Sequence, residues 1–172
     1  MKRVSIIGSG GAGKSTLARR MGEILELPVI HLDSRFWRPG WTETPTEEWR
    51  QIVEDLVKPD RWIIDGNFGG TMEIRLEASD TVIYLDYPPF VCLRRAIKRW
   101  ITHWNKTRPD MGEGCPEKMD SEFLRWVWMF PTETKPNIEK RLLNLNQKTR
   151  LVRLTSPRAT GKFLNSLRSA KN

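Results

Sequence analysis

The nine residues GSGGAGKST, from Gly8 to Thr16, constrain the fold of this chain more than any other stretch. They follow the short apolar run VSII, and the residues after them repeat apolar side chains at helical spacing until Pro28. The order strand, glycine-rich loop and helix is the arrangement in which backbone amides at a helix N-terminus surround a phosphate group. The sequence therefore predicts a phosphate-binding loop close to its start.

This loop satisfies two phosphate-binding patterns. Gly8, Gly10 and Gly13 spell G-x-G-x-x-G, which is typical of dinucleotide sites, while Gly8 and Gly13 with Lys14 and Ser15 spell G-x-x-x-x-G-K-[ST]. Lys14 and Ser15 favour a nucleoside triphosphate, because an ammonium on the outer phosphates and a hydroxyl on Mg²⁺ serve no purpose for a dinucleotide. We therefore expect ATP to be bound by Gly8, Gly10, Gly11, Ala12, Gly13, Lys14, Ser15 and Thr16.

Length and charge narrow the class of protein. The 172 residues suit one domain with one core and are too few for a dinucleotide domain joined to a catalytic domain. Twenty-nine Lys and Arg against 21 Asp and Glu give a net charge of +8, which favours anionic partners. The start MKRVSIIGSG resembles neither a signal peptide nor a membrane span, and Cys92 and Cys115 have no metal-binding spacing. We expect a cytoplasmic monomer or homodimer that does not bind membranes.

Four more apolar segments follow the first strand and alternate with helical patterns. They are PVIHLD, RWIIDGN, TVIYLDYP and TRLVRLTSP, ending at Asp33, Asp65, Asp86 and Ser156. Strands that are apolar on both faces and separated by helices predict an α/β fold, with a five-stranded parallel sheet between two helical layers. Ligands then gather at the carboxyl ends of the strands. Within this single domain, residues 44–47 predict a capping box that opens a helix.

The pattern loosens after the fourth strand. PDMGEGCPEKMDSEF is rich in turn residues and charge, and the aromatic cluster FLRWVWMFP follows it. We interpret residues 105–136 as a mobile helical lid of the domain.

Several motifs carry a resemblance to a known family. Through GSGGAGKSTLA, HLD, WIIDGNF and VIYLDYPPFVCLRRAIKR, residues 1–105 resemble the nucleoside-monophosphate-kinase-like, or adenylate-kinase-like, branch of P-loop proteins. HLDSRFWRPGW, IIDGNF and TVIYLDYP are similar, more narrowly, to the DNA topology modulation proteins (FlaR-like). The broader resemblance implies the three-layer P-loop NTPase fold and transfer of the γ-phosphoryl group of ATP with the help of Mg²⁺.

The resemblance implies roles for particular residues. Asp65 matches the acid that holds Mg²⁺ through water, beside the magnesium ligand Ser15. Where the family has proline and arginine, this chain reads NFGGTMEIR, so Arg75 takes the place of the arginine that binds the acceptor. Arg95 and Arg99 match a pair that contacts the triphosphate, and their spacing puts both on one helix face, although a solvated basic face would look the same.

The same resemblance extends to the lid. Arg108 and Arg125 flank it, where such kinases carry arginines that swing onto the transferred phosphoryl group. Of these two, Arg125 lies within the aromatic cluster FLRWVWMFP.

The residues after the second strand suggest an acceptor site. Asp33 could deprotonate an acceptor hydroxyl, or simply cap a turn. A phosphate acceptor would need Arg35 or Arg75 instead. Trp37 and Trp41 follow directly and could stack on a ring or seal a core edge.

Two functions of different classes remain open. The first is a P-loop kinase that transfers the γ-phosphoryl of Mg²⁺-ATP to a small acceptor. The second is a DNA-binding protein with a regulatory or vestigial ATP site, since residues 88–108 hold six Lys and Arg and no acid, interleaved with Trp100 and Trp104. No helix-turn-helix, zinc or RNA-binding signature supports the second.

Overall fold

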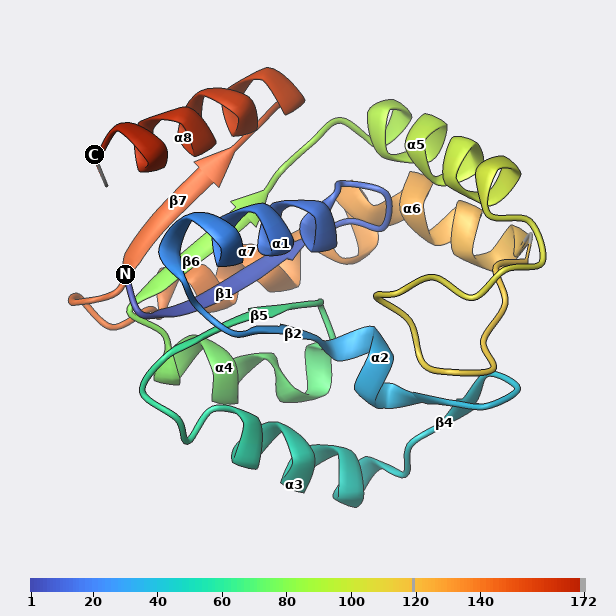
Figure 1. The fold of residues 1–172 in the computed structure, drawn as a ribbon, viewed down its shortest axis with the longest axis horizontal. Coiled ribbons are helices and arrows are strands. Elements are labelled where there is room, and N and C mark those ends of the chain that lie inside the picture. Colours follow the sequence, from blue (N-terminus) through green and yellow to red (C-terminus); the bar gives the residue numbers. More distant parts are fainter. Residues whose placement is uncertain (119, 171–172) are drawn as a thin grey trace.

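A five-stranded parallel sheet forms the centre of the molecule, as expected (Figure 1). The computed structural model describes residues 1–118 and 120–170. The strands lie in the order β2, β5, β1, β6, β7. Their bounds are β1 Arg3–Gly8, β2 Val29–His31, β5 Trp62–Asp65, β6 Thr81–Leu85 and β7 Arg150–Leu154.

The register of the strands brings their carboxyl ends together. His31 pairs with Asp65, Asp65 with Ile6, and Gly8 with Leu85. β1 is the central strand, so the glycine-rich loop that follows Gly8 leaves the middle of this edge. Polar residues that are distant in sequence therefore meet beside the loop.

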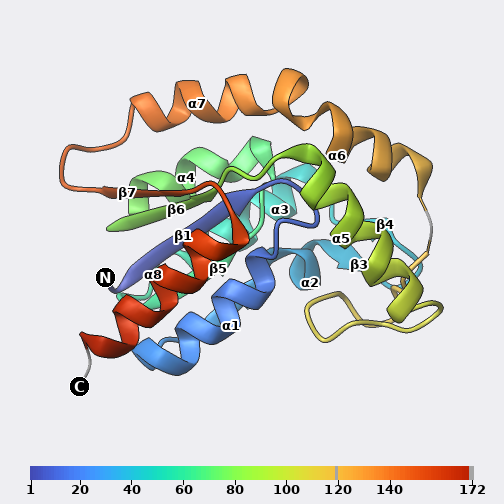
Figure 2. The same cartoon turned by 90° about the horizontal axis from the view of Figure 1, so that it is seen from above.

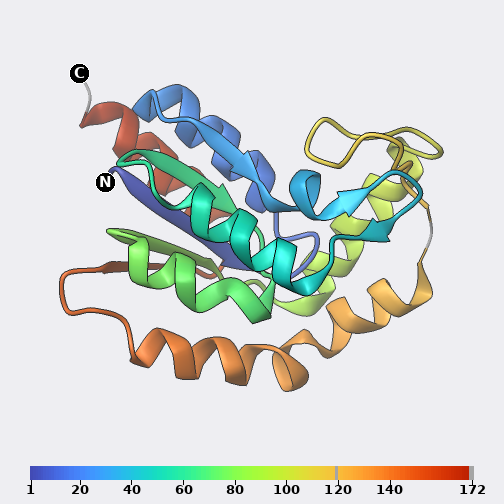
Figure 3. The ribbon, with the colours of Figure 1, turned by 90° about the horizontal axis from the view of Figure 1, so that it is seen from below.

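Helices cover both faces of the sheet (Figures 2 and 3). Alternate residues of β1 face opposite layers: Val4 and Ile6 pack with α1 (Lys14–Leu25) and α8 (Pro157–Ser169), whereas Ile7 packs with α4 (Met72–Ala78) and α7 (Lys135–Leu143). A third cluster joins β5 to α3 (Thr46–Leu56). This alternation is the period-two pattern of a strand buried on both faces.

A small insertion separates β2 from α3. It consists of the short helix α2 (Leu32–Phe36) and a two-stranded hairpin, β3 (Trp37–Arg38) and β4 (Thr42–Glu43). The capping box predicted at residues 44–47 is wrong: Pro45 occupies the N-cap position, and the Thr44 hydroxyl donates to the carbonyl of Phe36 at 2.7 Å. The Thr44 side chain thus stabilises the insertion by bonding to α2, and it does not cap α3.

The segment interpreted as a lid contains two different structures. α5 (Pro89–Thr102) is followed by an irregular stretch, residues 103–118, which we name the lid segment. The aromatic cluster forms α6 (Ser121–Glu133), which packs against α5 and α7. Val127 and Phe130 of α6 are buried in the core. A short 3₁₀ helix, η1 (Gly69–Thr71), precedes α4. None of the helices formed by the described residues is long and apolar enough to span a membrane.

Candidate functional site

The glycine-rich loop adopts a backbone that other residues resist. Gly11 and Gly13 have φ of +75° and +94°, in the left-handed region that favours glycine. A Cβ atom on Gly11 would also lie 2.2 Å from the carbonyl oxygen of Cys92 in α5. Position 11 therefore requires glycine for two reasons: its backbone is left-handed, and α5 leaves no space for a side chain.

Lys14 begins α1 and spans the loop. Its Nζ donates to the carbonyl oxygens of Gly8 at 2.9 Å and Ser9 at 3.0 Å. Burial lowers the pKa of this ammonium, while the carboxylates of Asp33 and Asp65 oppose that shift. The loop thus presents a positive charge together with the amides at the N-terminus of α1.

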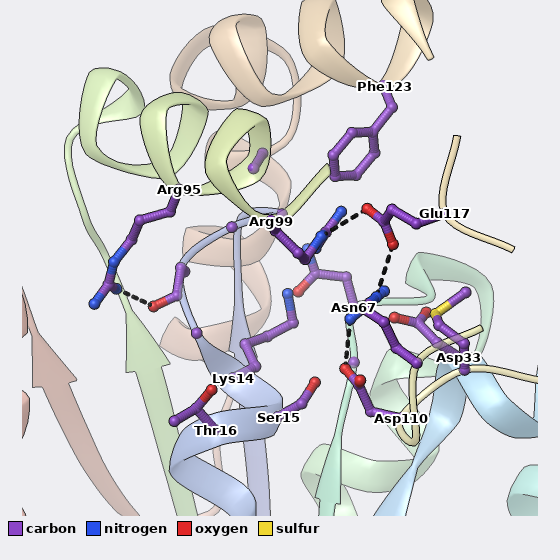
Figure 4. Close-up of a pocket in the computed structure, with 18 of the residues that line it drawn as sticks. Lys14, Ser15, Thr16, Asp33, Asn67, Arg95, Arg99, Asp110, Glu117 and Phe123 are labelled. Atoms are coloured by element: carbon purple, nitrogen blue, oxygen red, sulfur yellow. Dashed lines mark hydrogen bonds and ion pairs between the residues drawn. The ribbon is translucent and has the colours of Figure 1, made fainter. Parts of the chain in front are cut away.

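A cavity of about 860 Å³ lies over the loop (Figure 4). Its walls come from the loop and α1, the insertion, α5, the lid segment, α6 and the start of α8. The charged side chains in these walls are Lys14, Arg20, Asp33, Glu43, Arg95, Arg99, Arg108, Asp110, Glu117, Lys118 and Asp120. Such a space is large enough for a nucleotide and a small second molecule.

Two arginines of α5 lie beside the loop. The exposed Arg95 donates from Nη1 to the carbonyl of Ala12 at 3.1 Å, and its guanidinium lies 5.8 Å from the ring centre of Tyr87. The guanidinium of Arg99 lies 5.4 Å from the ring centre of Phe123 in α6. Both arginines expected to contact the triphosphate therefore line the cavity (Figure 4).

The lid segment contributes an ion-pair network over the cavity. Glu117 accepts from Nε of Arg99 at 2.8 Å and from Nε of Arg108 at 2.7 Å. Nη1 of Arg108 also donates to Asp110 at 2.7 Å. Burial would raise the pKa of Asp110, but Arg108 and the Ser15 hydroxyl outweigh it and lower that pKa. Sequence reasoning missed Glu117 and Asp110, because an irregular segment has no periodicity to show which side chains turn inward.

Asp33 lies in the first turn of α2 and lines the cavity. Burial raises the pKa of its carboxyl group, and the nearby charge of Lys14 reduces that rise. A half-buried carboxylate in the same cavity wall as the phosphate loop, with a raised pKa, is suited to take up a proton.

Asp65 ends β5 beneath the cavity and is only 3% exposed. Its Oδ1 lies 2.8 Å from Nδ1 of His31, and this hydrogen bond raises the pKa of the imidazole. Within residues 1–118 and 120–170, no hydrogen-bond partner is found for Oδ2 of Asp65. This buried oxygen is free to bind water or a cation.

Known proteins resemble this chain over most of its length, although no family model matches it. YqaC of Bacillus subtilis, an uncharacterised protein, is 26% identical over 133 residues, which cover 75% of this chain and 72% of YqaC. A shikimate kinase of Rhodococcus erythropolis is 31% identical over 134 residues, which cover 70% of this chain and 76% of that enzyme. This chain belongs to the shikimate-kinase-like family of P-loop kinases. It is an ATP-dependent phosphotransferase.

Solved structures show the same fold for this kinase. A shikimate kinase from Acinetobacter baumannii in complex with shikimate superimposes with a TM-score of 0.61 at 15% identity, covering 97% of this chain and 90% of that one. A gluconokinase from Sinorhizobium meliloti gives a TM-score of 0.53 at 14% identity, covering 99% of this chain and 91% of that one. The predicted P-loop kinase fold is confirmed, and the narrower resemblance to topology modulation proteins stays a prediction.

The residues of this kinase fit a magnesium ion that is shared with a nucleotide. No group of three or more His, Cys, Asp or Glu among the described residues could hold a metal by itself. Mg²⁺ in such sites takes one or two protein ligands, with phosphates and water supplying the others. Ser15 lines the cavity and the unpartnered Oδ2 of Asp65 lies below it, so both suit this role directly or through water.

Three arginines expected in the site of this kinase lie elsewhere. Arg75 is fully buried in α4 and donates from Nη1 to the carbonyl of Gly66 at 2.9 Å and from Nη2 to that of Asn67. Burial lowers the pKa of Arg75 to about 10. Arg35 and Arg125 are exposed, and neither belongs to the described cavity wall.

Asn67 is a further residue of the site that the sequence did not indicate. It follows Asp65-Gly66, lines the cavity, and accepts a hydrogen bond from the backbone amide of Gly8 at 3.0 Å through Oδ1. Together with Arg75 it joins the end of β5 to the first glycine of the loop. Arg75 therefore supports the site from below, whereas Trp37 and Trp41 line its wall.

Proposed function

We propose that this kinase transfers the γ-phosphoryl group of Mg²⁺-ATP to a hydroxyl group of a small metabolite. The observation that carries the proposal is the position of the Asp33 carboxylate. It lies in the wall of the same cavity as Lys14 and the phosphate loop, and each of the two charges alters the pKa of the other. A carboxylate and an ammonium on one cavity provide a base for the acceptor and a cation for the transferred group.

In this reaction the acceptor hydroxyl attacks the γ-phosphorus. Asp33 accepts the hydroxyl proton, a new P–O bond forms to the acceptor oxygen, and the bond between the γ-phosphorus and the β,γ-bridging oxygen breaks. The electron pair of that bond leaves on ADP. Because burial raises the pKa of Asp33, its carboxylate is a stronger base than an exposed aspartate.

The cations of the cavity stabilise the charge that develops on the phosphoryl oxygens. Lys14 is held at the loop by two carbonyl oxygens, and Arg99 lies beside it on α5. Placed in advance, such charges lower the barrier without reorganisation during the reaction. Mg²⁺, when bound, would neutralise part of the charge of the triphosphate.

A hydroxyl acceptor is favoured over a nucleoside monophosphate. A phosphate oxygen is already nucleophilic and needs cations rather than a base, yet Arg35 and Arg75 both lie outside the described wall of the cavity. The similar enzymes are named as a shikimate kinase and a gluconokinase. Both names denote kinases of small metabolites and not of nucleotides.

The test is acceptor-stimulated release of ADP by the purified protein. Mg²⁺-ATP is supplied with a panel of hydroxyl-bearing metabolites, nucleosides and nucleoside monophosphates. Lys14→Ala should lower kcat by about 10²–10³-fold, because one preorganised charge is lost. Lys98→Ala, an exposed lysine of α5 outside the cavity, serves as the control and should retain activity. Equal turnover by Lys14→Ala and the parent would refute the mechanism.

A further inference from the structure

The charges in the cavity wall are segregated. Lys14, Arg20, Arg95 and Arg99 project from α1 and α5, the elements that carry and cover the phosphate loop. The insertion and the lid segment contribute carboxylates instead: Asp33, Glu43, Asp110 and Glu117. In a chain whose net charge is +8, four carboxylates on one side of a cavity are an unusual local excess.

The two cations on this acidic side are already engaged. Arg108 is 11% exposed in its side chain and is paired with both Asp110 and Glu117, and Glu117 also pairs with Arg99, so both arginines of this cluster already have carboxylate partners. Nζ of Lys118 lies 5.5 Å from the ring centre of Trp41, over its face. No other Lys or Arg of the insertion or lid segment lines the described wall.

The arginines that could have paired with an anionic acceptor are directed elsewhere. The guanidinium of Arg75 is fully buried and bonds the carbonyls of Gly66 and Asn67. Arg35 follows Asp33 by two residues but is exposed outside the wall. Neither can neutralise a carboxylate or phosphate held beside Asp33.

An anion bound here would also oppose the chemistry. A second negative charge close to Asp33 would raise the pKa of its carboxyl group further, beyond the rise that burial already causes. A further rise in this pKa would leave a smaller fraction of Asp33 ionised and able to act as the base. An acceptor without negative charge avoids this effect.

Aromatic side chains line another part of the acceptor wall. Trp37 and Trp41 lie with ring centres 5.5 Å apart, and Phe68 lines the same cavity. The lid segment is fixed against the hairpin by the amide of Gly40, which donates to Gly114 at 3.0 Å, and by Nε1 of Trp41, which donates to Pro116 at 3.2 Å. Apolar rings lower the local dielectric constant, so they strengthen charge interactions beside them.

From these observations we infer that the acceptor is a hydroxyl compound with no anionic group, neutral or cationic, which packs against the ring of Trp37. This inference rests on the proposed phosphotransfer function and specifies its acceptor class. Aromatic faces bind uncharged rings and cations and disfavour anions, and the carboxylates of the wall act in the same direction.

The experiment compares acceptors in pairs of similar size that differ mainly in charge. The pairs are methyl shikimate with shikimate, gluconamide with gluconate, and glucosamine with glucuronate, each with saturating Mg²⁺-ATP. The uncharged or cationic member should have a kcat/KM for ADP release that is several-fold higher, the ratio expected from one ion pair. A higher kcat/KM for the anionic members would overturn the inference and leave the proposed function intact. No stimulation by any compound would contradict the proposed function itself.

A pair of variants tests the same inference from the protein side. Asp110→Asn releases one partner of Arg108, so the ratio of kcat/KM for anionic over uncharged members should rise several-fold. Glu43→Gln, on the exposed hairpin, should lower the preference for the amine without altering the KM for ATP, and it keeps the test intact if Asp110→Asn fails to fold. Glu47→Gln, outside the wall, is the control. Unchanged ratios in both variants would overturn the inference.

Discussion

The carboxylate of Glu117 holds Arg99, its Oε1 accepting a hydrogen bond from Nε of that arginine at 2.8 Å. The side chain of Glu117 is 6% exposed, and its second oxygen accepts from Arg108. One carboxylate of the lid segment thus pairs with two guanidinium groups that line the cavity. A bound triphosphate would present oxygens to the same guanidinium groups, so phosphate and carboxylate compete for them.

Glu117→Gln should therefore separate stability from nucleotide binding. The amide keeps one acceptor but removes the charge, and loss of charge-assisted hydrogen bonds should lower the free energy of unfolding by about 1–3 kcal/mol. ATP should bind several-fold more tightly, because the triphosphate no longer competes with a carboxylate for Arg99 and Arg108. Denaturant unfolding and calorimetric titration with Mg²⁺-ATP measure the two effects.

Glu113→Gln is the matched control, since this glutamate lies on the same lid segment and is exposed. It should change neither quantity. Weaker ATP binding by Glu117→Gln would mean that the carboxylate positions the guanidinium groups for the nucleotide instead of competing with it.

Asp33→Asn should make the protein more stable and less active. Burial raises the pKa of Asp33 in the folded state, which means that its ionised form is disfavoured there. The ionised carboxylate therefore lowers the free energy of unfolding at neutral and higher pH, and this effect disappears at low pH. The neutral amide removes this effect at pH 7–8, so Tm should rise. Loss of the general base should lower kcat by about 10²–10⁴-fold.

The pH profile provides a second reading of the same variant. In the parent, kcat/KM should fall toward acid pH at a value above the ordinary pKa of aspartate, and this limb should be missing from the residual activity of Asp33→Asn. Asp60→Asn, at an exposed aspartate before β5, controls for charge alone. A lower Tm for Asp33→Asn would show that the carboxylate stabilises the fold.

Local patterns in the sequence were sufficient to predict the phosphate loop and the parallel sheet. The glycines between Gly8 and Ser15 permit the backbone conformation of the loop. Strands that are apolar on both faces must be covered by helices on both sides, which indicates a parallel sheet. Strand order is a different matter, since hydrophobic periodicity says which segments are buried but not which ones are neighbours. Asp33, expected at the end of a strand, lies in α2 because β2 already ends at His31.

The acceptor side was harder to predict because long-range contacts determine it. Arg75 resembles a substrate-binding arginine in sequence, yet its helix turns it under the loop to bond Gly66 and Asn67. Glu117 and Asp110 stand in a segment without periodicity, and their partner Arg108 identifies them only in three dimensions. The expected lid is divided, since Val127 and Phe130 fix α6 in the core.

The same substitution at two glycines should have opposite effects. Gly11→Ala forces a side chain into a left-handed backbone and against the carbonyl of Cys92, so it should lower the free energy of unfolding by about 1–3 kcal/mol. Gly161 lies within α8, and a Cβ there meets open space. Gly161→Ala should raise the free energy of unfolding by about 0.5–1 kcal/mol through helix propensity. Urea unfolding measures both, and destabilisation by Gly161→Ala would reveal an unseen contact.

The His31–Asp65 pair should make stability depend on pH. The hydrogen bond that the imidazole donates to Asp65 raises the folded-state pKa of His31 above its ordinary value, so folding favours the protonated imidazole. The stabilisation is fully present below the unfolded pKa of about 6.5 and is lost as pH rises through the folded pKa. The free energy of unfolding of the parent minus that of His31→Asn should therefore decrease between pH 6 and pH 9. Proton NMR of the imidazole follows the titration directly, and Asp65→Asn should move the pKa of His31 downward. If the pKa of His31 is the same in Asp65→Asn as in the parent, the carboxylate does not determine the pKa of the imidazole.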